Sequence, residues 1–266
     1  MLPKISIKDS NFDRNSYKRL GDYFRWEWDL NVSPVVYTDR RFAEAMKDDV
    51  DVKIAWLVEP PIIIPAQYEF VEQHIGLFDL VLTFDYDLAQ RYENASFYPL
   101  GGSWVFTEDR KIHQKSKLLS MVTSLKKNTI GQRKRIEIMD RYGSQMDLYG
   151  REFKPIDNKA DGLGEYCFSF AIENSSLKYY FTEKLIDCFI TGTVPIYWGC
   201  PEIEKFFNTD GMILIESIDE VGRIIEGLSF EKYNRMKDAV VENYKKALSY
   251  CSLENNLWNA GLKDFK

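Results

Sequence analysis

Short apolar runs rich in β-branched residues alternate with amphipathic segments along most of the chain. Such runs predict buried strands, and their alternation with helices predicts a mostly parallel sheet covered on both faces. The expected strands are residues 35–38, 52–58, 79–83, 118–124, 146–149, 167–172 and 194–198. The expected helices are residues 40–46 (a helix or a turn), 68–75, 132–142 and a long terminal helix over 230–250.

Two further helices have clear start signals. Thr182 can cap one helix and Gly192 can end it. Between them lies one apolar stripe, formed by Leu185, Ile186, Phe189 and Ile190. The other helix is expected to begin at Ser217, because Glu220 three residues later completes a capping box.

The chain of 266 residues is long enough for two compact domains. Residues 107–117 are polar and charged, and the α/β pattern restarts after them, so we expect a boundary between residues 112 and 113. Two α/β units in tandem favour a ligand-binding cleft between them.

Composition excludes several classes of protein. A net charge of −6 with a pI of about 5.2 disfavours a general nucleic-acid binder. The four cysteines fit no zinc pattern, so we expect free buried thiols. The N-terminus lacks an apolar signal region, and the apolar run near residues 60–66 is short and interrupted by proline. We therefore expect a cytoplasmic protein with at most peripheral membrane contact.

Residues 168–199 have the layout of a nucleotide-sugar donor site. A buried strand ends in Glu173-Asn174-Ser175, a helix begins at Thr182-Glu183-Lys184, and a second strand ends at a glycine. Ligands of open α/β sheets bind at the carboxyl ends of strands and at helix N-termini. A lysine in a first helical turn opposes the helix dipole, so a bound anion explains Lys184 better than helix stability does. A solvated surface lysine is the alternative, and Glu183 suits a first turn whatever its function.

Other residues are candidates of lesser specificity. Basic residues cluster at 126–135, and Arg135 is the best phosphate ligand among them because apolar residues follow it at helical spacing. Glu59 ends a predicted strand and precedes two prolines, which suits a general base. Asp85 and Asp87 form a DxD triplet that could chelate a cation, although such triplets are common. For each of them, a solvated surface role is the alternative.

The aromatic residues of the first half are also dense. Some of them could stack on sugar rings, but core packing is the commoner role. These aromatic residues are Trp26, Trp28, Tyr37, Trp56 and Trp104. Neither histidine forms a convincing catalytic dyad. No GxGxxG motif follows a strand, which disfavours dinucleotide binding, and no GxxxxGK[ST] motif is present, which disfavours P-loop chemistry.

The segment from residue 168 to residue 207 resembles the donor-domain motif of glycosyltransferase family 10, the α-1,3/4-fucosyltransferases, especially the bacterial members. The matching residues are Glu173-Asn174-Ser175, then Tyr180-Phe181-Thr182-Glu183-Lys184, and Val194-Pro195-Ile196-Tyr197-Trp198-Gly199-Cys200-Pro201. Residues 124–150 are similar to the family's serine and arginine-helix segment, in which either Arg135 or Arg133 corresponds to the arginine.

This resemblance implies a GT-B-like fold of two Rossmann-like domains facing across a cleft, with a short N-terminal domain. Residues 1–112 would bind the acceptor and residues 113–266 the nucleotide-sugar donor. The implied reaction is inverting transfer of L-fucose from GDP-fucose to a glycan hydroxyl, without a metal bound through the DxD triplet. A bacterial or viral polysaccharide pathway is the expected context.

The resemblance also assigns roles to individual residues. Glu59 would be the catalytic base, and Glu183 would act both in catalysis and in donor binding. The remaining donor-binding residues would be Arg135, Asn174, Tyr180 and Lys184. Two alternatives stay open: an inverting transferase that uses another nucleotide sugar, and an inactive glycan-binding module.

Overall fold

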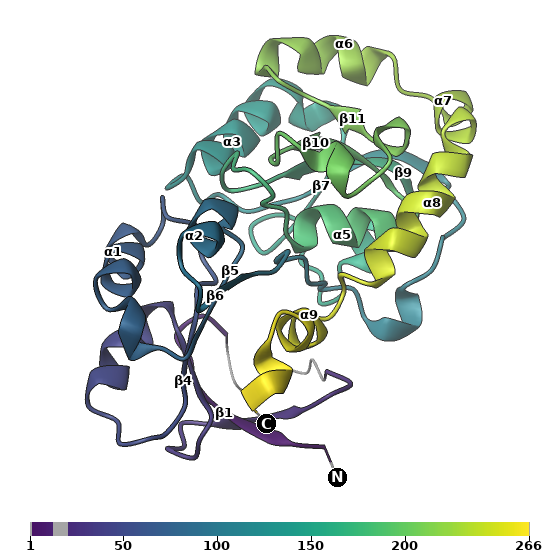
Figure 1. The fold of residues 1–266 in the computed structure, drawn as a ribbon. Helices are drawn as coiled ribbons and strands as arrows, with labels where there is room; N and C mark the ends of the chain where they lie inside the picture. The colour runs from purple at the N-terminus through teal and green to yellow at the C-terminus, as the bar shows by residue number, and fades with distance from the viewer. Residues whose placement is uncertain (1, 13–20, 266) are drawn as a thin grey trace. The chain divides into compact units, whose positions relative to one another are not determined.

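The structure is a computed structural model that describes residues 2–12 and 21–265. The chain divides into two compact units. Unit 1 comprises residues 1–100 and 252–266, and unit 2 comprises residues 101–251. Figure 1 shows the elements of each unit.

Unit 1 is built on a parallel sheet with the strand order β2-β1-β3-β4-β5-β6. Its strands are β1 (Lys4–Lys8), β2 (Arg25–Trp28), β3 (Val35–Thr38), β4 (Lys53–Trp56), β5 (Leu80–Thr83) and β6 (Ala95–Phe97). Its helices are η1 (Asp39–Met46), α1 (Pro65–Gln73), η2 (Ile75–Leu77), α2 (Tyr86–Arg91), α9 (Leu253–Asn259) and η8 (Leu262–Phe265). Tyr37 and Trp56 are fully buried in this unit, so they serve the core, as the commoner reading expected.

Unit 2 is built on a second parallel sheet, with the order β11-β10-β9-β7-β8. Its strands are β7 (Lys117–Val122), β8 (Asp147–Tyr149), β9 (Tyr166–Ile172), β10 (Val194–Trp198) and β11 (Ile213–Leu214). Every residue of β9 is buried, which explains why this strand is mostly apolar along its length rather than alternating. The chain order of the strands reverses between β7 and β9, which makes this the switch point of the sheet.

Helices cover both faces of the unit 2 sheet. They are α3 (Ile130–Tyr142), α4 (Ala160–Leu163), α5 (Glu183–Ile190), α6 (Val221–Glu226), α7 (Phe230–Arg235) and α8 (Lys237–Leu248). Short 3-10 helices lie between them: η3 (Thr107–Asp109), η4 (Gly143–Gln145), η5 (Ile203–Lys205), η6 (Thr209–Gly211) and η7 (Ile218–Glu220). Side chains of α4 and α5 share one apolar cluster, while those of α3 and α6 belong to another with Phe168 and Ile196. Accordingly, α3 and α5 lie on opposite sides of the sheet in Figure 1.

The expected helix starts are confirmed. The Thr182 side chain caps α5 by accepting a hydrogen bond from the Lys184 N–H group. The capping box of Ser217 and Glu220 is present, although the first turn after it is 3-10 and α6 follows from Val221.

The helix expected over residues 230–250 is present as two helices, because the helical segment is interrupted at Met236. The backbone of Met236 has φ −91° and ψ 0°, and its N–H group donates to the carbonyl of Tyr233, three residues earlier. Tyr233 is buried against Phe168, and its hydroxyl donates to the Gly192 carbonyl. This anchoring fixes α7 on the sheet, while α8 continues from Lys237 and packs on α5.

The units do not divide where the composition changes. The polar residues 107–117 form a loop and η3 inside unit 2, whereas the chain passes between the units after residue 100 and again after residue 251. Residues 252–266 belong to unit 1 because Trp258 stacks on Tyr23 and Phe24, and Asn255 accepts a hydrogen bond from the Asp22 N–H group. The roles expected for the two domains remain predictions.

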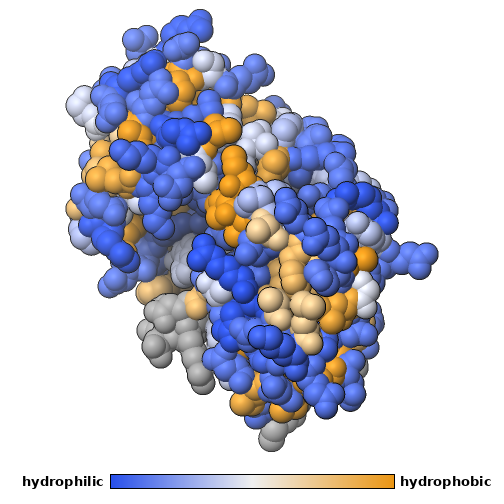
Figure 2. Space-filling model, turned by 90° about the vertical axis from the view of Figure 1, so that its left-hand side faces the viewer, coloured by the Kyte–Doolittle hydropathy of each residue, from blue (hydrophilic) through white to orange (hydrophobic). Residues whose placement is uncertain are grey.

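On the face drawn in Figure 2, hydrophilic residues cover most of the area and hydrophobic residues lie between them. None of the helices in residues 2–12 and 21–265 has the length and apolar character needed to cross a bilayer. All four cysteines are buried and free, as expected.

Candidate active site

A small cavity lies in unit 2 at the switch point of its sheet, where open α/β folds bind ligands. Its volume is about 20 Å³, which is enough space for a water molecule. The apolar part of its wall comes from Val122, Leu163, Phe170, Ile172 and Cys188. The charged part consists of Arg135, Lys159, Lys184 and Asp187, so three cations converge here with one carboxylate.

Two glycines allow the chain to pack tightly around the end of β9. The N–H group of Gly131 in α3 donates to the Asn174 carbonyl at 3.1 Å. A Cβ atom at position 131 would lie 1.7 Å from the carbonyl oxygen of Glu173, which no side chain can tolerate. At Gly199, a Cβ atom would lie 2.5 Å from Cγ of Glu173. Glycine at both positions therefore brings the start of α3 and the end of β10 against Glu173 and Asn174.

Glu173 organises the start of α5. Its side chain is fully buried, and its carboxylate accepts hydrogen bonds from the Thr182 N–H group at 2.8 Å and the Thr182 hydroxyl at 2.7 Å. Burial raises the pKa of Glu173, and the Lys184 ammonium group offsets part of this effect. Sequence reasoning gave Glu173 no role of its own, although a carboxyl residue directly after a mostly apolar strand was the signal.

Lys184 does have anionic neighbours, and they belong to the same chain. Its Nζ lies 3.0 Å from Oε1 of Glu183 and 3.7 Å from Oε2 of Glu173, and it donates to the Thr182 hydroxyl at 3.1 Å. Burial alone would raise the pKa of Glu183, but the ammonium groups of Lys184 and Lys159 lower it below its ordinary value. The unfavourable position of Lys184 in the helix dipole is therefore already offset by two carboxylates.

Arg135 and Arg133 differ in where the structure places them. Arg133 is exposed, whereas Arg135 is only 8% exposed and its Nη2 donates to Oδ1 of Asn174 at 2.5 Å. Burial lowers the pKa of Arg135, and the carboxylates of Glu173 and Glu183 oppose that shift. The buried Nε of Arg135 and the buried hydroxyl of Ser175 have no hydrogen-bond partner among the described residues. Unpaired buried polar groups are unfavourable, so they indicate a site built for a ligand.

Glu59 lies in unit 1, directly after β4, and is partly buried. The carboxylate of Asp39 accepts hydrogen bonds from the N–H groups of Val58 at 2.9 Å and Glu59 at 3.2 Å. The Tyr68 hydroxyl donates to the Glu59 carbonyl at 3.3 Å. Burial raises the pKa of Asp39, and the hydrogen bonds from these N–H groups and from the Asn11 amide oppose the rise. The resulting pKa is about 6, against an ordinary value of 3.8. The backbone that carries Glu59 is thus fixed by residues that follow a different strand.

Residues 112–245, half of the chain and all within unit 2, match the family model described as glycosyltransferase family 10 (fucosyltransferase), C-terminal part. The chain belongs to glycosyltransferase family 10. This confirms the resemblance inferred from the sequence motif. The candidate residues Arg135, Asn174, Tyr180, Glu183 and Lys184 all lie inside the matched range, whereas Glu59 lies outside it.

Individual family 10 proteins are similar to parts of the chain. An α-(1,3)-fucosyltransferase from Helicobacter pylori is 35% identical over 111 residues, which are 41% of this chain and 22% of that protein. The chain thus matches about a fifth of the length of this curated relative.

Solved structures agree in fold over nearly the whole chain. A crystal structure of an α1,3-fucosyltransferase with GDP has a TM-score of 0.58 and 17% sequence identity, with 94% of this chain and 89% of that chain covered. One of an α1,3-fucosyltransferase with GDP-fucose has a TM-score of 0.56 and 16% identity, over the same shares of the two chains. The expected GT-B-like fold, with two Rossmann-like units, is confirmed.

The family 10 motif residues occupy distinct places in unit 2. Tyr180 is buried, Asn174 binds Arg135, and Glu183 and Lys184 contact each other at the start of α5. The structure therefore brings Arg135 and Lys184 to the same cavity. Asn174 is bonded to Arg135, and Glu183 is paired with Lys184. Their roles in binding remain predictions.

The DxD triplet and the two histidines have structural explanations instead. Asp85 caps α2, because its Oδ1 accepts a hydrogen bond from the Leu88 N–H group at 3.0 Å, and Asp87 lies in the first turn. The rings of His74 and His113 bond the backbone carbonyls of Phe70 and Asp109. These contacts account for the residue types without catalysis.

Sequence reasoning missed two charged residues of the cavity, Lys159 and Asp187. A signal for the second was present: Asp187 lies between Ile186 and Cys188 in a helix whose other residues are mostly apolar. A carboxylate in such a helix requires a cation or several hydrogen bonds. The partner could not be found from the sequence, because it lies on a different element.

Proposed function

We propose that this family 10 protein is an inverting glycosyltransferase that moves L-fucose from GDP-fucose to a glycan hydroxyl. The observation that carries the proposal is the buried guanidinium group of Arg135. It lies at the switch point of the unit 2 sheet, next to Lys184 on the same cavity, and its Nε has no partner in the part of the chain that the structure describes. Such a site suits a diphosphate, which needs fixed donors and positive charge as it departs.

The proposed reaction is a single displacement. Glu59 takes the proton of the acceptor hydroxyl, whose oxygen bonds to the anomeric carbon while the bond from that carbon to the diphosphate oxygen breaks. Attack from the face opposite GDP inverts the anomeric centre. Arg135 and Lys184 stabilise the negative charge of the released GDP, so no essential metal is required. General-base assistance of this kind contributes roughly 10²–10⁴-fold to the rate.

The remaining candidates position the donor. Asn174 holds the guanidinium group of Arg135 by its amide oxygen, which leaves the other guanidinium donors for phosphate oxygens. Glu183, kept ionised by two ammonium groups, accepts hydrogen bonds from sugar hydroxyls. We assign Tyr180, a buried residue of the same motif, to the remaining nucleotide and sugar contacts. The partners are thus a GDP-sugar donor and a glycan acceptor, with no nucleic acid and at most peripheral membrane contact at a cytoplasmic location.

A donor screen tests this proposal. The full chain is incubated with GDP-fucose, GDP-mannose, UDP-sugars or dTDP-sugars, and thermal stabilisation is measured first. Release of GDP is then followed with a small panel of glycan acceptors. We expect stabilisation by GDP-fucose and acceptor-dependent release of GDP. Preference for another nucleotide sugar would replace the donor, and glycan binding without donor cleavage would indicate an inactive binding module.

A further inference from the structure

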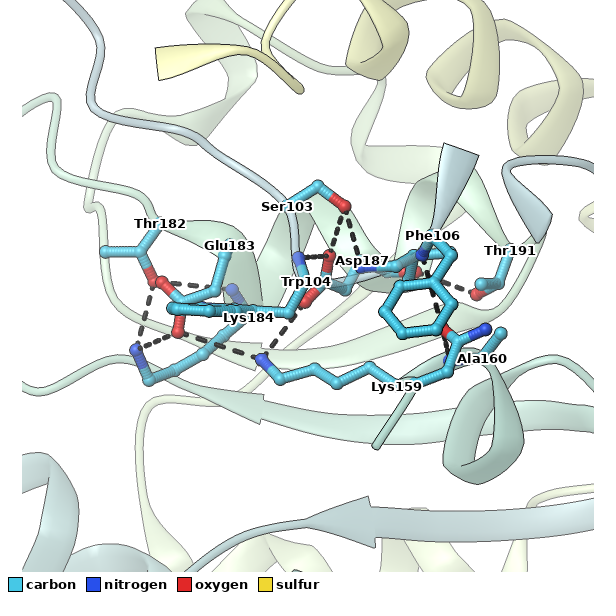
Figure 3. Close-up of polar contacts among 12 residues, drawn as sticks. Ser103, Trp104, Phe106, Lys159, Ala160, Thr182, Glu183, Lys184, Asp187 and Thr191 are labelled. Atoms are coloured by element: carbon cyan, nitrogen blue, oxygen red, sulfur yellow. Dashed lines mark hydrogen bonds and ion pairs between the residues drawn. The ribbon is translucent and has the colours of Figure 1, made fainter. Parts of the chain in front are cut away.

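An ion pair between Lys159 and Asp187 borders the candidate donor cavity (Figure 3). Lys159 directly precedes α4, and Asp187 lies in α5. Nζ of Lys159 is 3.0 Å from Oδ2 of Asp187 and 3.7 Å from Oε1 of Glu183. In Figure 3 the ammonium groups of Lys159 and Lys184 approach the Glu183 carboxylate from two sides.

Asp187 is itself held firmly. Its side chain is 1% exposed, and its Oδ1 accepts hydrogen bonds from the Ser103 hydroxyl at 2.8 Å and the Trp104 N–H group at 3.0 Å. With Oδ1 used in this way, Oδ2 is the atom that faces Lys159. A fixed carboxylate of this kind restricts where the ammonium group can lie.

The backbone of Lys159 is fixed as well. Oδ1 of Asn158 accepts hydrogen bonds from the N–H groups of Ala160 at 3.1 Å and Phe106 at 3.3 Å. These bonds join the start of α4 to the loop that also contacts Asp187. Both ends of the Lys159 side chain are therefore positioned by the same part of unit 2, and its ammonium group is held at the cavity.

The charges of the site leave a need for this cation. Lys184 lies beside both Glu183 and Glu173, which offset part of its charge, so a further cation beside Lys184 and Arg135 adds to the positive charge that the cavity offers a diphosphate. Burial disfavours charge on Lys159, but the carboxylates of Asp187 and Glu183 raise its pKa above the ordinary value, so it is a cation at neutral pH. Contact at 3.7 Å with Glu183 is loose enough to be exchanged for a phosphate oxygen.

We infer that Lys159 is a third donor-binding cation, which contacts a phosphate oxygen of the nucleoside diphosphate while Asp187 holds its ammonium group in place. The inference rests on the proposed function, because it concerns the same donor. It deepens that proposal by assigning a binding residue to Lys159 and a positioning residue to Asp187. The rival explanation is structural: Lys159 serves only to neutralise the buried carboxylate of Asp187.

A double-mutant cycle separates the two explanations. Binding of GDP and of guanosine to the full chain is measured by calorimetry and ligand-observed NMR for the wild type, Lys159→Met, Asp187→Asn and the double variant, with thermal unfolding in parallel. We expect Lys159→Met to weaken GDP binding roughly 10- to 100-fold, as the loss of a charged hydrogen bond implies, with guanosine binding unchanged. The double variant should recover thermal stability without recovering GDP affinity.

The rival explanation makes the opposite forecast for the double variant. If Lys159 only neutralises Asp187, removing both charges restores GDP affinity together with stability, and the inference is overturned. Lys159→Arg keeps a cation and should retain most of the GDP affinity, which covers the case in which Lys159→Met alone folds poorly. Lys246→Met removes a matched, half-exposed lysine paired with Glu242 and should leave GDP binding unchanged.

Lys184→Met distinguishes failure of this inference from failure of the proposed function. If the wild type binds GDP and Lys184→Met weakens binding while Lys159→Met does not, only the inference about Lys159 fails. If the wild type binds no GDP, the proposed function fails and the inference fails with it.

Discussion

The start of α5 in unit 2 differs in construction from the segment of unit 1 that follows β4 and carries Glu59, here called the Glu59 loop. At the start of α5, charged side chains contact one another: Glu173, Glu183 and Asp187 are matched by Lys184 and Lys159. In the Glu59 loop, the stabilising contacts join the Asp39 carboxylate to backbone N–H groups. The first arrangement fixes side-chain charges, which suits binding of an ionic ligand. The second arrangement fixes the backbone that carries Glu59.

This difference predicts a separation of effects. Changes at the start of α5 should alter GDP affinity, whereas changes in the Glu59 loop should alter the rate of transfer with GDP affinity preserved. The following variants test that separation, in order of decreasing expected effect.

The largest effect is expected for Glu59→Gln. The glutamine cannot accept the acceptor proton, so kcat should fall roughly 10²–10⁴-fold. GDP affinity, measured by calorimetry, should stay within a factor of two or so of the wild type because no phosphate contact is lost. The rate is measured as acceptor-dependent GDP release.

Glu69→Gln is the matched control, since Glu69 is an exposed glutamate of α1 in the same unit. Its kcat should equal that of the wild type. Transfer by Glu59→Gln at nearly the wild-type rate would remove Glu59 as the base, and a joint loss of GDP affinity would break the separation between the two regions.

The next effect is expected for Lys184→Met. Loss of a charged hydrogen bond to the diphosphate should weaken GDP binding roughly 10- to 100-fold. Because Lys184 also balances Glu173 and Glu183, some loss of thermal stability should accompany it. Calorimetric titration with GDP is the measurement, and unchanged affinity would exclude Lys184 from the donor site.

The same contrast explains what the sequence could predict. Around α5 the strand, cap, apolar stripe and next strand are signalled by neighbouring residues, so β9, α5 and β10 were located almost to the residue. Arg135 was also expected to lie inward because of the apolar residues that follow it, and it is buried whereas Arg133 is exposed.

Contacts between distant residues were not predictable in this way. No local pattern indicated that Asp39 bonds the N–H group of Glu59, that Lys159 pairs with Asp187, or that residues 252–266 return to unit 1. Each depends on the order of strands and helices in space rather than on local pattern. The break at Met236 was missed for the same reason, because Tyr233 is held by β9 and Gly192.

A smaller effect is expected for Glu173→Gln. The carboxylate accepts two hydrogen bonds from Thr182, and an amide can accept only one of them, so a buried donor loses its partner. The free energy of unfolding should fall by about 1–3 kcal/mol. Chemical denaturation of the full chain gives this value. Glu202→Gln, a carboxylate outside the cap of α5, serves as the comparison, and equal losses in both would show that the cap of α5 is not special.

The smallest effect is a dependence on pH that should have opposite signs in the two regions. The folded pKa of Asp39 is raised to about 6 from an ordinary value of 3.8 by burial, so the folded state binds more protons between these values. Stability from Asp39 is therefore complete below pH 4 and is lost as pH rises toward 6. The pKa of Glu183 is lowered in the folded state, so its contribution is present above the unfolded pKa and is lost as the solution is acidified.

The stability advantage of the wild type over Asp39→Asn should thus shrink between pH 4.5 and 7, by about 1 kcal/mol or more. Its advantage over Glu183→Gln should not shrink over that interval. Denaturation of the three proteins at matched pH values measures both differences, and parallel pH slopes would contradict the distinction between a carboxylate held by backbone donors and one held by ammonium groups.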